Sequence, residues 1–197
     1  WQEVADYMQP RKADVTRTRS RGDKRTELIF DSSPIQAVEL LAASLHGMLT
    51  NPSTPWFSLR YKDEGLDADD EAKLWLEGVT ETMYTAFNRS NFQQEIFELY
   101  HDLITFGTAA MFIEEDQNDL LKFSTRHINE IYITENDKGR IDTVYRRFKI
   151  TLRAAAQQFG TNLSEEAKKK VDKDPFDEID ILHAVYPRIE FNPAKKD

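Results

Sequence analysis

The residues that can do acid–base or metal chemistry are scattered along this sequence. The four histidines, His46, His101, His127 and His183, form none of the paired spacings that bind a metal ion. His101 stands next to Asp102 in a helical pattern, where adjacent side chains point in different directions. His127 and His183 lie at the ends of predicted strands, so a shared site would depend on the fold. Packed or surface histidines are therefore the simpler interpretation, and we expect no metal site.

The other common signatures of chemistry are missing as well. The sequence has no phosphate-binding loop, no dinucleotide-binding glycine fingerprint and no hydrolase nucleophile elbow. It contains no cysteine, which excludes disulfides and thiolate chemistry and fits a reducing cytoplasm. The acidic loop 63–70 lacks the central glycine and terminal glutamate of a calcium-binding hand, so its acids are expected to cap the next helix. We expect no catalytic residue and no cofactor.

Basic residues gather in one segment near the start of the sequence. Only Asp14 and Asp23 oppose them, and the segment has no apolar periodicity. One interpretation is an arm that contacts phosphates. The interpretation favoured by composition is a solvated loop that does not pack. The seven basic residues are Arg11, Lys12, Arg17, Arg19, Arg21, Lys24 and Arg25.

Composition sets the broad class. The 197 residues are enough for one substantial domain or two small ones, and 40% hydrophobic with 31% charged residues is typical of a globular protein. No apolar run approaches the roughly 20 residues that span a bilayer, and no signal peptide is recognisable, so we expect no membrane partner. The net charge of -9 argues against a general nucleic-acid-binding surface but leaves a local basic patch possible. Because the sequence starts at Trp1 without a methionine, we expect a piece of a longer polypeptide.

A helix followed by a strand, over Ser90 to Glu115, is the predicted centre of the fold. Ser90 with Gln93 has capping-box spacing, and Gly107 can end the helix in a left-handed conformation. A nearly continuous apolar run over residues 108–113 then predicts a buried strand. The predicted buried stripe of the helix is Phe92, Ile96, Leu99, Leu103 and Phe106.

Helices are also predicted over residues 34–50 and 69–89. Ser33, Pro34 and Gln36 mark the start of the first one, and a rigid turn after it leads into a predicted strand from Trp56 to Tyr61. The predicted buried positions of the first helix are Ile35, Val38, Leu41, Ala42, Leu45 and Met48.

The second half of the sequence predicts short strands over residues 120–125, 130–134, 141–150 and 179–189. A hairpin turn falls at residues 136–139, and Thr151 and Ser164 cap two short helices. The predicted fold class is α+β, with several amphipathic helices packed on a small, mostly antiparallel sheet. The predicted organisation is an N-terminal helix and basic loop (1–30), an α+β domain (31–191) and a polar tail (192–197).

Several of these segments, read in order, resemble one family of proteins. The run from Leu40 to Pro52, the strings around residues 90–110, the pair Arg146 and Phe148, and the run from His183 to Arg188 resemble the head-to-tail connecting, or portal, proteins of short-tailed bacteriophages. The residues that carry the resemblance include Gly47, Asn51, Pro52, Pro55, Trp56, Phe57, Ser90, Asn91, Phe92, Phe106, Gly107, Thr108, Pro187 and Arg188.

The resemblance implies a structural subunit of a larger portal protein, with this sequence as its N-terminal wing region. Such subunits form a ring, usually of twelve copies, at one vertex of the virion capsid, and are assembled in the host cytoplasm. Double-stranded DNA is packaged and ejected through the ring, so the implied partners are other portal subunits, the capsid or scaffold protein, the terminase, the tail proteins and the DNA. ATP hydrolysis belongs to the terminase, and the resemblance implies no catalytic residue or cofactor.

Two other functions remain open from the residues alone. A nucleic-acid-binding module would use the basic segment 11–25 and would bind duplex DNA with a steep salt dependence. An enzyme would need a deep pocket that gathers His101, His127 or His183 with carboxylates.

Overall fold

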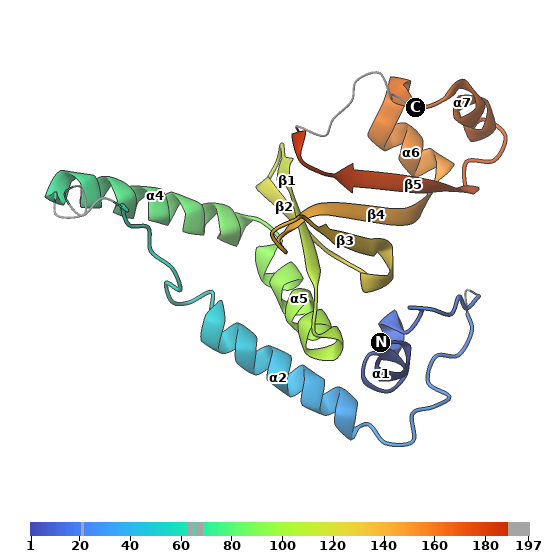
Figure 1. Cartoon of the computed structure of the whole chain (residues 1–197), viewed down its shortest axis with the longest axis horizontal. Coiled ribbons are helices and arrows are strands. Elements are labelled where there is room, and N and C mark those ends of the chain that lie inside the picture. Colours follow the sequence, from blue (N-terminus) through green and yellow to red (C-terminus); the bar gives the residue numbers. More distant parts are fainter. Residues whose placement is uncertain (21, 63–64, 66–68, 189–197) are drawn as a thin grey trace. The chain divides into compact units, whose positions relative to one another are not determined.

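The structure, a computed structural model of the chain, describes residues 1–20, 22–62, 65 and 69–188 (Figure 1). The chain divides into two compact units, Trp1–Asn129 and Glu130–Asp197. The three-part division predicted from the sequence stays a prediction, because residues 192–197 lie outside the described part. Helices and two small antiparallel sheets together confirm the α+β class.

The first unit holds four α-helices and one hairpin in its described part. α2 packs along α5, and α5 also contacts β1 and β2. β1 and β2 are antiparallel, with Ala110 opposite Arg126 and Asp116 opposite Leu120. The elements are α1 (Gln2–Met8), η1 (Pro10–Lys12), α2 (Ser33–Leu49), α4 (Asp70–Arg89), α5 (Phe92–Phe106), β1 (Ala110–Asp116) and β2 (Leu120–Arg126), followed by η2 (Ile128–Glu130) at the boundary.

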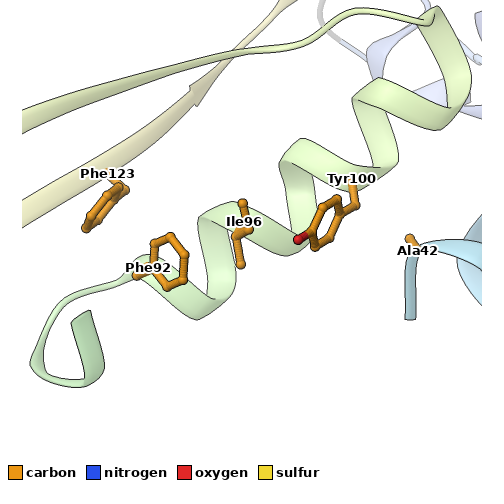
Figure 2. Packing of buried hydrophobic residues seen from close by; sticks show 5 residues of the cluster. All are labelled: Ala42, Phe92, Ile96, Tyr100 and Phe123. Carbon is orange, nitrogen blue, oxygen red and sulfur yellow. The ribbon is translucent and has the colours of Figure 1, made fainter. Parts of the chain in front are cut away.

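The core of this unit is organised by α5. Figure 2 shows Phe92, Ile96 and Tyr100 along α5, with Phe123 of β2 beyond Phe92 and Ala42 of α2 near Tyr100. The spacing of four residues puts these α5 side chains on one face of the helix. All five residues are buried, and each large apolar side chain removed from water contributes roughly 1.5–3 kcal/mol. The predicted central role of this helix is confirmed.

The second unit contains a three-stranded antiparallel sheet in the order β3-β4-β5. Short helices lie between β4 and β5 in the sequence. The hairpin turn between β3 and β4 places Gly139 at φ +68, as its sequence predicts. Thr151 and Ser164 accept hydrogen bonds from the backbone N–H groups of Ala154 and Ala167, so both predicted helix caps are confirmed. The elements are β3 (Ile131–Glu135), β4 (Ile141–Thr151), α6 (Leu152–Phe159), η3 (Gly160–Asn162), α7 (Glu165–Val171) and β5 (Glu178–Val185).

Several local predictions are wrong. Residues 56–61 are irregular instead of a strand, because the N–H groups of Trp56 and Phe57 donate to the Tyr84 hydroxyl at 2.6 Å each instead of to a neighbouring strand. The N-cap of α5 is Asn91, one residue beyond Ser90. The last strand ends at Val185, before the predicted end at residue 189, which itself lies outside the described residues.

The predicted buried stripes also need correction. Leu41 and Met48 of α2 and Leu103 of α5 are exposed, as is Ile113 in the strand predicted to be buried. α2 has apolar residues on all sides, whereas α5 covers only the side that carries Val38 and Ala42. Periodicity identified the helices but could not tell which of several apolar faces has a partner within the chain.

Candidate functional site

The basic segment is a candidate site, and one of its cations, Lys12, already forms an ion pair within the protein. The Lys12 ammonium lies 2.8 Å from each carboxylate oxygen of Asp102 on α5. The Asp102 side chain is only 2% exposed, and the Gln9 amide donates to it at 3.1 Å. A buried carboxylate needs such partners, because leaving a charge unpaired away from water is costly. Lys12 therefore anchors the start of the basic segment to the central helix.

A second cluster of ion pairs links the basic segment to α1. Arg19 contacts Asp6 at 2.9 Å and Asp14 at 3.1 Å, and Arg25 contacts Asp14 at 2.7 Å. Asp6 is a buried residue of α1. The Gln2 side-chain oxygen adds a backbone contact by accepting from the N–H of Thr16 at 2.8 Å. The segment is therefore folded back against the first helix.

The same contacts perturb ionisation. Burial alone would raise the pKa of Asp14, but hydrogen bonds from Arg25 and Arg19 outweigh it and lower the pKa below its ordinary value of 3.8. Hydrogen bonds to Asp6 and Asp14 raise the pKa of Arg19 above its ordinary value. Both shifts favour the charged forms, as expected for an ion-paired cluster.

The expectation of an unpacked, solvated loop is wrong for Lys12, Arg19 and Arg25. Lys12 and Arg19 pair with Asp102 and Asp6, which lie outside the segment, so its local composition could not reveal them. Arg25 pairs with Asp14 inside the segment. The remaining basic side chains differ: Arg11, Arg17 and Lys24 are exposed, Arg17 lies 3.9 Å from Asp6, and Arg21 lies outside the described residues.

The histidines have separate structural roles. The ring of His127 is hydrogen-bonded to the Lys12 carbonyl at 2.9 Å, and the ring of His46 is hydrogen-bonded to the Thr50 hydroxyl at 3.1 Å. His183 lies on β5 in the second unit. Within the described residues, no three His, Cys, Asp or Glu side chains come together in a way that could hold a metal ion.

His101 lines an open hollow of about 480 Å³ between α1, α2 and α5. Its ring lies 3.1 Å from Glu39, and Glu98 on the same wall lies 3.4 Å from Lys12. Both carboxylates thus have a basic neighbour, and the described residues that line the hollow include no serine, threonine or cysteine. The hollow brings His101 near acids, as the enzyme hypothesis required, but its described lining offers no hydroxyl or thiol nucleophile.

Some of the residues behind the family resemblance pack against one another. Trp56 stacks on Phe92 with ring centroids 5.8 Å apart, and Phe57 stacks on Tyr84 at 4.4 Å. Tyr84 was missed by the sequence reasoning as a hydrogen-bond partner, although it stands on the apolar side of a predicted helix. These residues join the turn after α2 to α4 and α5.

Other resemblance residues secure the ends of α5. The Asn91 side chain both donates to the Phe123 carbonyl and accepts from the Phe123 N–H, each at 2.8 Å, and so fixes β2 to the start of the helix. The Phe106 carbonyl accepts from the Trp1 indole at 2.8 Å, and Gly107 ends the helix at φ +74, as predicted.

The others are scattered. The Ser90 hydroxyl accepts from the Phe92 N–H at 3.2 Å, and the Asn51 side chain from the Ser53 N–H at 2.8 Å. Gly47 is exposed on α2, whereas Pro187 and Arg188 follow β5. Pro52, Pro55 and Thr108 lie in connecting segments outside the helices and strands. The resemblance residues therefore do not form one common site.

The fold is α+β, and charged and aromatic residues hold the segments of the first unit together. The chain belongs to the bacteriophage head to tail connecting protein family, whose model matches residues 1–197. It is 31% identical over 200 residues to the probable portal protein of Bordetella phage BPP-1, and 30% identical over 200 residues to the portal protein of Salmonella phage epsilon15. Each match covers 100% of this chain and 36% of the relative, so the chain spans about a third of the length of these proteins.

A membrane-spanning helix is not found in the described part of the chain, where no helix has both the length and the apolar character to cross a bilayer.

Proposed function

We propose that this chain is the N-terminal wing part of a portal subunit, with a structural role in the ring through which phage DNA is packaged and ejected. The observation that carries the proposal is the family match over residues 1–197, together with two relatives named as portal proteins that align with the whole chain. In this proposal the partners of the complete protein are other portal subunits in a ring of twelve copies, capsid or scaffold protein, terminase, tail proteins and double-stranded DNA. Its location is the portal vertex of the virion, after assembly in the host cytoplasm.

The charges of the chain support a structural role in preference to one that grips DNA. The net charge is -9, which repels a polyanion, and a channel must let DNA slide. Lys12, Arg19 and Arg25 are engaged by carboxylates. We assign the exposed Arg11, Arg17 and Lys24 to contacts with other protein surfaces. No catalytic residue or cofactor enters the proposal.

Electron microscopy of the full-length protein tests this function. We expect closed rings that contain many copies of the subunit. In a phage that lacks the gene, the full-length protein supplied in the host is expected to restore DNA-filled heads. A full-length protein that forms no ring, or heads that fill with DNA without it, would contradict the proposal.

A further inference from the structure

We draw no further inference here: the strongest candidate, the exposed apolar face of α2 around Leu40 and Met48, is an unpartnered surface, and nothing in the described part of the structure shows what covers it.

Discussion

The basic segment and α2 differ in which kinds of side chain they bury and which they expose to water. The segment 11–25 is rich in charge, yet Lys12 and Arg19 reach the buried carboxylates of Asp102 and Asp6. α2 is rich in apolar residues, yet Leu40 and Met48 are largely exposed. Charged residues are usually exposed and large apolar residues usually buried, so both regions depart from the common pattern.

This difference teaches where each region finds its partner. The charges of Lys12, Arg19 and Arg25 are paired within the chain, so their removal should act on the stability of the chain itself. Leu40 and Met48 of α2 lie outside the core of the described chain, so changes there should leave its stability almost unaffected. Stability measurements therefore separate the two regions.

The largest effect is expected from Lys12→Met. The variant leaves Asp102 buried with only the Gln9 amide as a side-chain partner, and breaking a buried ion pair on one side costs roughly 3–5 kcal/mol. Urea unfolding followed by tryptophan fluorescence measures the loss in the first unit, which contains all three tryptophans.

Two controls define this first prediction. Arg17→Met removes an exposed cation 3.9 Å from Asp6 and is expected to cost at most about 1 kcal/mol. The double variant Lys12→Met with Asp102→Leu is expected to recover most of the loss, because an apolar pair removes the unpaired charge. Equal losses from Lys12→Met and Arg17→Met would show that the ion pair with Asp102 does not anchor the segment.

Two truncations of α2 give the next largest effect. Val38→Ala removes a buried side chain that faces the core and is expected to cost roughly 1.5–3 kcal/mol of unfolding free energy. Leu40→Ala removes a larger but exposed side chain and is expected to cost less than about 0.5 kcal/mol. The same urea titration measures both. A loss from Leu40→Ala as large as that from Val38→Ala would mean that Leu40 packs against another part of the chain.

A smaller effect of opposite sign is expected from Gly47→Ala. Since the added Cβ meets nothing within 4 Å, alanine should stabilise this chain by roughly 0.5–1 kcal/mol. Serine at the same position serves as the matched second variant, with a weaker gain in stability. Destabilisation of the isolated chain would show that Gly47 is required by the chain itself.

Much of this fold could be predicted from the sequence because its signals are local. Turn and cap residues such as Gly107, Gly139 and Thr151 act within a few positions, and the structure places them as predicted. Apolar periodicity found α2 and α5 to within one or two residues. The irregular path of residues 56–61 could not be predicted, because the donors of Trp56 and Phe57 are satisfied by a hydroxyl from a distant helix.

The candidate site was less predictable, for a related physical reason. The basic residues were evident, but whether they are free depends on carboxylates brought near by the fold. Asp102 stands 90 positions from Lys12 and was identified only as a neighbour of His101. Likewise, the sequence pattern of α2 shows that the helix is apolar. How much of its apolar surface is buried depends on which other elements of the chain pack against it, and the pattern does not show this.

The smallest effect is expected from the acid dependence of the ion-pair cluster. Because the pKa of Asp14 is lowered in the folded state, its charge stabilises the fold above the ordinary value of 3.8, and this contribution is lost as the pH falls through the lowered value. Asp14→Asn should therefore reduce the unfolding free energy near neutral pH, and the difference from the unaltered chain should shrink toward zero in acid. Urea unfolding at several values from about pH 7 to about pH 2 measures it. Arg25→Gln, which removes one donor to Asp14, should give a smaller difference with the same pH dependence. A difference that stays constant over this range would mean that Asp14 acts through packing, so that the segment is held by its contacts more than by its charges.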